Sequence, residues 1–122
     1  ELWRRSIYRF VVRTTPHEFL TTLDCPDPAN LTPKRLVTTT PLQALILSNN
    51  PFMLKQAGSF AERLQEKAGT QPAAQVRLGF ALAFGRHPST EEQRAAEITI
   101  RTKGLFALCH VLLNANEFVY ID

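Results

Sequence analysis

The placement of proline constrains this chain most strongly, because proline has no backbone N–H and is tolerated only at the start of a helix or in irregular segments. Thr40 followed by Pro41 is typical of a helix N-cap and first helical position, since the hydroxyl accepts an unpaired backbone N–H. Pro51 and Pro72 are suited to open two further helices. Other prolines gather at positions 16, 26, 28 and 33. The sequence therefore predicts a helical region after residue 40 and a largely irregular one before it.

Apolar residues after Pro41 recur every three or four positions, as they do on one face of a helix. Gly69 and Gly85 are suited to end helices, and Ser89 with Glu92 has the spacing of a capping box. We predict a mainly α fold with helices at residues 41–48, 51–67, 73–84, 90–98 and 105–115. The side chains expected to be buried together are Phe60, Leu64, Val76, Phe80, Phe84, Leu108 and Leu112. Leu54 and Leu82 are expected on the same apolar stripes.

The first forty residues carry weaker helical signals. Residues 5–15 are rich in β-branched and aromatic side chains and alternate apolar with basic residues, which favours a short strand over a helix. The proline-rich segment, residues 16–41, is expected to be a loop with one turn of helix at 17–23. Asn49 and Asn50 suit the C-terminal turn of the first long helix, and residues 117–122 are expected to be extended.

The composition fits one globular domain. Of 122 residues, 44% are hydrophobic and 20% charged, which excludes a disordered chain.

The 14 Lys and Arg residues exceed the 11 Asp and Glu residues slightly, giving a net charge of +3, and they are scattered along the chain. Proteins that bind nucleic acid concentrate such residues on one face, and a helix-turn-helix at residues 41–67 would carry Glu62 and Glu66. No segment approaches the roughly 18 apolar residues that cross a membrane. We predict no nucleic-acid binding and no membrane span.

Five strings of residues stand out when they are read together and in order. They are Arg4-Arg5-Ser6-Ile7-Tyr8, Asp24-Cys25-Pro26-Asp27-Pro28, Thr38-Thr39-Thr40-Pro41-Leu42-Gln43-Ala44-Leu45, Gly85-Arg86-His87-Pro88 and Leu113-Asn114-Ala115-Asn116-Glu117-Phe118. In this order and spacing they resemble the planctomycete-type domain of unknown function fifteen fifty-three, over nearly the whole chain.

The resemblance implies a context and no mechanism, since the family has no established catalytic residues. Its members commonly form the C-terminal part of large exported proteins that also carry a cytochrome-c-like domain. The resemblance implies that residues 1–122 are a single domain at the C-terminal end of a larger periplasmic or extracellular protein. Its partners would be the other domains of that protein, among them the cytochrome-c-like domain. Residues 97–103 are short for the link between the family's last two helices, which raises the hypothesis that residues are missing there.

The two cysteines raise two questions. The string Phe106-Ala107-Leu108-Cys109-His110 is similar to the Cys-x-x-Cys-His motif that attaches c-type haem, but Phe106 replaces the first cysteine. We therefore expect Cys109 to pack on the apolar face of the last helix, and this chain to hold no haem or other cofactor. A disulfide between Cys25 and Cys109 is one alternative in an oxidising compartment, and two free thiols are the favoured one.

Six charged residues around the proline-rich loop form a candidate polar cluster: Arg4, Arg5, Asp24, Asp27, Lys34 and Arg35. Arginine forks bind carboxylate, sulfate or phosphate, so one reading is an anion site. The same forks bonded to Asp24 and Asp27 would hold a loop that has few regular backbone bonds, and this structural role is favoured. A turn stabilised by aspartate is likewise favoured over a calcium site, which needs more oxygen ligands.

No residue pattern indicates a reaction. His17, His87 and His110 lack the spacing of zinc ligands, no serine stands in a Gly-x-Ser-x-Gly elbow, and there is no glycine-rich phosphate loop. The leading hypothesis is a non-catalytic structural or interaction module of an exported, cytochrome-associated bacterial protein. The alternative is part of a composite enzyme site, or of a carbohydrate- or anion-binding site, formed with an upstream domain. An open pocket lined by unpaired arginine and aspartate side chains would favour that alternative.

Overall fold

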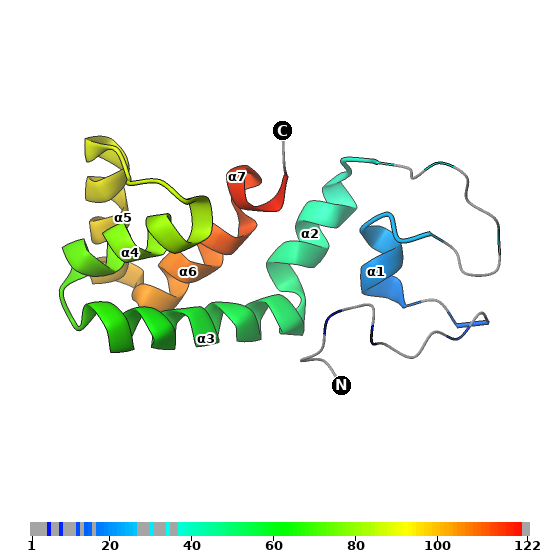
Figure 1. The fold of residues 1–122 in the computed structure, drawn as a ribbon, viewed down its shortest axis with the longest axis horizontal. Helices are drawn as coiled ribbons and strands as arrows, with labels where there is room; N and C mark the ends of the chain where they lie inside the picture. Colours follow the sequence, from blue (N-terminus) through cyan, green and yellow to red (C-terminus); the bar gives the residue numbers. More distant parts are fainter. Residues whose placement is uncertain are drawn as a thin grey trace. The chain divides into compact units, whose positions relative to one another are not determined.

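The computed structural model describes residues 5, 8, 12, 14–15, 17–26, 30, 34 and 37–120. Over these residues the protein is mainly α, as predicted, with seven helices and no strand (Figure 1). In chain order the helices are α1 (Glu18–Thr22), α2 (Pro41–Asn49), α3 (Pro51–Ala68), α4 (Pro72–Phe84), α5 (Thr90–Lys103), α6 (Leu105–Asn114) and α7 (Asn116–Val119). The chain divides into two compact units, residues 1–47 and 48–122.

The first unit contains α1 and most of α2. The helix α1 confirms the single helical turn predicted at residues 17–23. Of the strand predicted at residues 5–15, the structure describes Arg5, Tyr8, Val12, Thr14 and Thr15, none of which lies in a strand. The backbone N–H of Tyr8 donates to the carbonyl oxygen of Arg5 at 2.9 Å, as in a tight turn. The rest of that predicted strand lies outside the described residues.

The second unit begins at the junction of α2 and α3. Here Asn50 caps α3, because its Oδ1 accepts a hydrogen bond from the backbone N–H of Phe52 at 2.8 Å. Our assignment of Asn50 to the C-terminal turn of α2 was therefore wrong. Proline at the next position cannot continue an existing ladder of backbone bonds but can open a new helix. Gly69 and Gly85 end α3 and α4 with φ of 69° and 70°, as predicted.

Two predictions about the last third of the chain were wrong. Residues 97–103 continue α5 to Lys103, and Gly104, with φ of 92°, is the single residue between α5 and α6. Packing of Ile100 against the core favours a helix where β-branched residues alone do not. Residues 116–119 form the short helix α7 and are not extended. Only Tyr120 has extended backbone, and residues 121–122 lie outside the described part.

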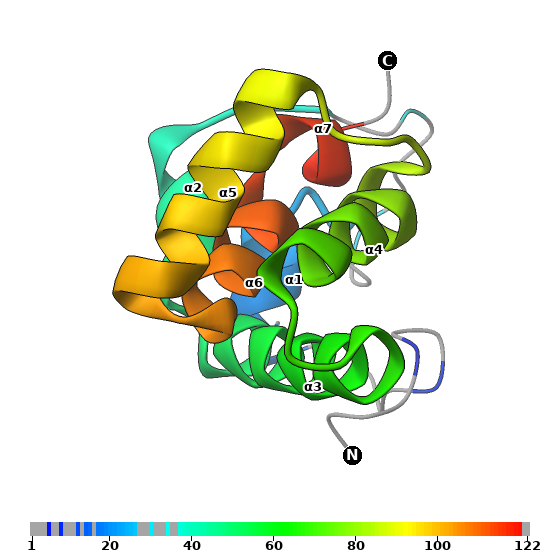
Figure 2. The same ribbon diagram turned by 90° about the vertical axis from the view of Figure 1, so that its left-hand side faces the viewer.

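The helix α6 lies among α3, α4 and α5 and packs against all three (Figure 2). One group of buried side chains consists of Val76, Phe80, Ala96, Leu108 and Leu112. A second consists of Ala57, Leu64 and Cys109. Burial of a large apolar side chain is worth about 1.5–3 kcal/mol, so these contacts supply the main stabilisation of the unit.

Close approach of α4 to its neighbours depends on Gly79. A Cβ atom at this position would lie 3.2 Å from Cδ1 of Leu112 and 3.4 Å from Cδ1 of Leu64. Those distances are tighter than ordinary carbon contacts, so a larger residue would push the helices apart. The glycine thus serves helix packing in the middle of α4.

The predicted core is mostly correct. Five of its seven members are buried, and Phe60 and Phe84 are half-buried against them. Leu54 and Leu82 were wrongly placed on the buried stripes, since they are 37% and 41% exposed. The reason is rotation about the helix axis. The buried side of α3 runs through Met53, Ala57 and Leu64, which leaves Leu54 at its edge.

Candidate functional site

Arg86 is the most highly connected polar side chain of the second unit. It stands directly after Gly85, which ends α4. Its guanidinium forms two hydrogen bonds with each of two carboxylates. Nη1 and Nη2 donate to the two oxygens of Glu92, both at 2.9 Å. Nε and Nη2 donate to the oxygens of Glu117 at 2.8 Å and 2.9 Å. We call Arg86, Glu92 and Glu117 the Arg86 cluster. Because these residues come from the α4–α5 turn, α5 and α7, the cluster ties the three elements together.

The electrostatics of the Arg86 cluster follow from this geometry. Hydrogen bonds from Arg86 lower the pKa of Glu92 to about 2, with a further contribution from the backbone N–H of Ser89. Arg86 also lowers the pKa of Glu117 and has its own pKa raised by the two carboxylates. The guanidinium carbon lies 5.5 Å from the ring centre of Phe80, which is within cation–π range. All three groups therefore stay charged at neutral pH, and none is poised to exchange a proton there.

Glu92 has a second role at the start of α5. Its Oε2 accepts the backbone N–H of Ser89 at 2.7 Å, and the Ser89 hydroxyl accepts the backbone N–H of Glu92 at 3.2 Å. This is the predicted capping box, and its presence confirms where α5 begins. The carboxylate that caps α5 is thus the one that Arg86 holds.

The first unit contains a second polar arrangement, centred on Asp24. Its carboxylate accepts hydrogen bonds from the backbone N–H and the hydroxyl of Thr38, at 2.6 Å and 2.8 Å, and from Nε2 of Gln43 at 3.4 Å. Gln43 Nε2 also donates to the Thr38 hydroxyl at 2.9 Å, and Gln43 is buried although it is polar. We call Asp24, Thr38 and Gln43 the Asp24 cluster. It joins the segment after α1 to the start of α2.

Gln43 completes a reciprocal cap on α2. Its Oε1 accepts the backbone N–H of Thr40 at 3.2 Å, while the Thr40 hydroxyl accepts the backbone N–H of Gln43 at 3.3 Å. The predicted N-cap at Thr40 is therefore confirmed. We did not predict the role of Gln43, although Thr-x-x-Gln is a capping-box spacing that would have indicated it.

The candidate polar cluster predicted from the sequence is described only in part. Asp24 lies in the arrangement given above and has a positive φ of 60°. Arg5 and Lys34 are exposed. The remaining members lie outside the described residues: Arg4, Asp27 and Arg35. Whether the six residues act together thus stays a prediction.

Cys109 packs in the core, as expected from the apolar face of α6. It is fully buried between α3 and α6, and burial raises the pKa of its thiol to about 11. Nε2 of the next residue, His110, donates to the carbonyl oxygen of Ser48 at 2.9 Å. Phe106, at the position of the missing haem cysteine, is 45% exposed. Cys25 and Cys109 are both free thiols.

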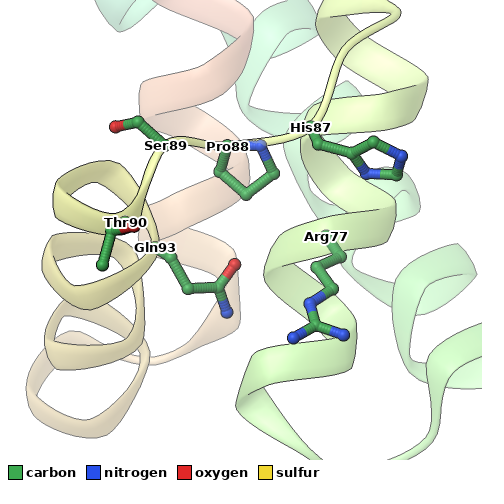
Figure 3. A pocket seen from close by; sticks show the side chains of 6 residues that line it. All are labelled: Arg77, His87, Pro88, Ser89, Thr90 and Gln93. Atoms are coloured by element: carbon green, nitrogen blue, oxygen red, sulfur yellow. The ribbon is translucent and has the colours of Figure 1, made fainter.

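A shallow groove of about 460 Å³ lies beside the start of α5. We call it the Arg77 groove, and it is lined by Arg77, His87, Pro88, Ser89, Thr90 and Gln93. Figure 3 shows the side chains of Arg77 and Gln93 extending toward the space between α4 and α5, whereas the Ser89 hydroxyl points away. Gln93 Nε2 donates to the carbonyl oxygen of Ala73 and to a carboxylate oxygen of Glu97, and its buried Oε1 has no hydrogen-bond partner among the described residues.

A second groove, of about 320 Å³, is mainly apolar. We call it the Phe118 groove, and it is lined by Gln56, Ser59, Phe60, Arg63, Leu82, Ala83, Leu113 and Phe118. Its residues come from α3, α4, α6 and α7. The Arg77 groove holds His87 with Ser89 and Thr90, but among the described residues no hydrogen bond joins the imidazole to either hydroxyl. Among the residues that the structure describes, no three metal-ligating side chains come together. No described helix is long and apolar enough to span a membrane.

Sequence reasoning placed no functional weight on Arg86, Glu92 and Glu117 as a set. Arg86 and Glu117 stand in two of the five strings that carry the resemblance, 31 positions apart. Only folding shows that these strings meet, and the Asp24 cluster joins two further strings in the same way.

Comparison with known proteins gives one result. A model of a protein family described as "Protein of unknown function (DUF1553)" matches residues 1–100. No curated protein and no solved structure matches. Because the family model spans most of the chain, and because the strings joined by the two clusters fall largely within it, this chain belongs to the DUF1553 family of proteins of unknown function.

Proposed function

We propose that this chain is a non-catalytic interaction module that packs against other domains of an exported, cytochrome-associated bacterial protein. The family supplies the context, since its members commonly accompany a cytochrome-c-like domain. The proposed compartment is the periplasm or the cell exterior. The chain itself would hold no cofactor and would serve as scaffold and binding surface.

The observation that carries this proposal is the internal pairing of the Arg86 cluster. A catalytic arginine or glutamate needs a free face toward a substrate, or a pKa near the working pH. Here one guanidinium is shared by two carboxylates, and the pKa of Glu92 is about 2. These charges hold α5 and α7 in place, which is a structural task.

The exposed apolar side chains of the second unit support a role in binding. They are Leu54, Leu82, Ile98, Phe106, Val111, Phe118 and Tyr120. Scattered exposed apolar residues are ordinary, but Leu82 and Phe118 share one groove. A module that meets a partner there would remove this surface from water.

The proposal is tested by separating the module from its parent protein. The chain and the remainder of the parent are produced separately, mixed and titrated by calorimetry. Saturable association is expected, together with no turnover by the chain alone. A lack of association at protein concentrations on the order of 100 μM, which are high enough to populate a complex with a micromolar Kd, would contradict the proposal.

A second candidate function is an anion- or carbohydrate-binding site completed by another domain. The observation in its favour is the Arg77 groove, where the side chains of Arg77 and His87 make no ion pair with any described residue. Titration with inorganic phosphate or sulfate, comparing the native chain with Arg77→Met, checks this alternative. Binding that is lost in the variant would favour it over the interaction module.

A further inference from the structure

We infer that the Phe118 groove is the docking site of this module, and that its occupant is an acidic amphipathic helix of a neighbouring domain. This inference rests on the proposed function and names the surface and the partner chemistry. Three features of the groove support it: an apolar floor, a wall held by the Arg86 cluster, and a cation at its edge.

The floor and sides of the groove are apolar. Phe60 and Leu113 are half-buried, and they belong to the residues packed against the core. Leu82 and Phe118 line the same groove but remain 41% and 42% exposed. Partly exposed aromatic side chains such as Phe118 are typical contacts for a partner at an interface, and Leu82 adds apolar surface to the same groove.

The wall of the groove is held by an ion pair. Phe118 directly follows Glu117, whose carboxylate is bound by Arg86 through two hydrogen bonds. The helix α7 has only four residues and would not be stable alone. The pair therefore positions Phe118 beside Leu82 before any partner arrives, which lowers the entropy lost on binding.

The edge of the groove has one charge, and that charge is unpaired. Arg63 is exposed on α3, makes no ion pair with any described residue, and is the only charged side chain in the lining. A carboxylate on the partner would be attracted to it, whereas a basic partner would be repelled.

The open shape of the groove favours a helix over a small molecule. At about 320 Å³ it lies at the low end for small-molecule pockets, which enclose most of their ligand, and it is open to solvent. An open groove between helices suits the apolar face of an amphipathic helix, which inserts side chains from successive turns. The remaining polar lining, Gln56 and Ser59, can then bond to the partner's polar edge.

Two synthetic peptides test the inference. Each is about fifteen residues long, or roughly four helical turns, with leucines along one face. One carries glutamates beside the leucines, and the other carries lysines at the same positions. Binding of each peptide to the full chain is measured by fluorescence anisotropy. The variants are Arg63→Glu, Phe118→Ala and Leu82→Ala. The controls are Arg94→Glu and Ile98→Ala, which lie exposed on α5 outside the groove.

The expected results form a pattern that a general loss of folding would not produce. The native chain prefers the acidic peptide, and Arg63→Glu reverses that preference. Phe118→Ala and Leu82→Ala each lower the affinity for the acidic peptide about tenfold, as the loss of a buried contact residue does. The two control variants bind like the native chain. Thermal unfolding of each variant checks that it is folded.

Several outcomes would overturn the inference. It fails if neither peptide binds, if the lysine peptide binds as well as the acidic one, or if the control variants weaken binding as much as the groove variants. It also fails if the chain self-associates and Phe118→Ala abolishes that association, since the occupant is then a second copy. If the remainder of the parent protein binds normally to every groove variant, the docking site is elsewhere while the interaction module stands.

Discussion

At the scale of single residues, one arginine organises the second unit. Arg86 uses its planar fork to bind two carboxylates at once, a geometry that lysine cannot reproduce. The two glutamates come from α5 and α7, so the side chain joins elements that share no backbone bond. The residue thereby acts as a tie between helices.

Acid should loosen this tie. The folded pKa of Glu92 is about 2 against an ordinary value of 4.5, and that of Glu117 is lowered as well. A lowered folded pKa gives stability that is complete above pH 4.5 and is lost as the pH falls toward 2. We expect Arg86→Met to have a lower Tm than the native chain at pH 7, and the difference to shrink steadily as the pH falls from 4.5 toward 2.

Thermal unfolding followed by circular dichroism at several pH values measures this. Arg94→Met, which removes an exposed arginine from α5, is the control and should leave the Tm nearly unchanged at every pH. A constant difference between Arg86→Met and the native chain down to pH 2 would show that the ion pairs are not its cause.

Asp24 offers a residue-scale test of scaffold against anion site. Its carboxylate accepts bonds from Thr38 and Gln43, and hydrogen bonds to a charged group are worth about 1.5–3 kcal/mol, least where they are exposed. Asp24→Ala should therefore destabilise the chain by about 1.5 kcal/mol in urea unfolding. If stability is unchanged and binding of phosphate is altered instead, the scaffold role is wrong.

At the scale of elements, helix starts were readable because capping is local chemistry. Thr40 and Ser89 cap α2 and α5 through residues three positions later in the chain. The end of α5 was misread, although Gly104 stands directly after its last residue. Residues 97–103 carry β-branched side chains, and only Ile100, packed on the core, shows why α5 continues to Lys103.

The cap on α5 gives a prediction with a matched control. Ser89→Ala removes the acceptor for the backbone N–H of Glu92 and should cost about 1 kcal/mol. Ser59→Ala, an exposed serine within α3, should be neutral or slightly stabilising because alanine has the higher helix propensity. Urea unfolding of both variants compares them. Equal stability of the two would mean that the cap contributes nothing.

At the scale of the whole molecule, the second unit owes its stability to α6 packed among three helices. Leu64 is fully buried and Leu54 is 37% exposed, although both lie on α3. Leu64→Ala should cost about 2–5 kcal/mol, and Leu54→Ala should cost far less. Urea unfolding measures the free energy of unfolding of both variants. Similar losses would mean that the buried side of α3 has been assigned incorrectly.

The absence of covalent haem is a further prediction for the whole chain. Phe106 replaces the first cysteine of the attachment motif, and the thiol of Cys109 is fully buried with a pKa of about 11. A thiol that is inaccessible and protonated should not form a thioether. The purified chain, made with haem available, is expected to show no Soret band, and such a band would contradict this reading.

The sequence by itself determined the mainly α fold, most helix bounds, most of the core and the family. These depend on local rules: proline and glycine positions, capping spacings, and apolar residues at helical period. It did not show that Leu54 and Leu82 face solvent, because the apolar stripe of a helix is wider than the surface that the helix buries against its neighbours. It also missed α7, whose four residues have no strong local signal.

Only the tertiary structure decided the sites. The Arg86–Glu117 pair joins residues 31 positions apart, and the Asp24–Thr38 bonds join residues 14 apart. Sequence spacing carries no information about such pairs, since they form only after α4, α5 and α7, or α1 and α2, have taken their places. Local chemistry therefore predicted the helices, while long-range packing decided which of their charged side chains meet and which groove they leave beside Phe118.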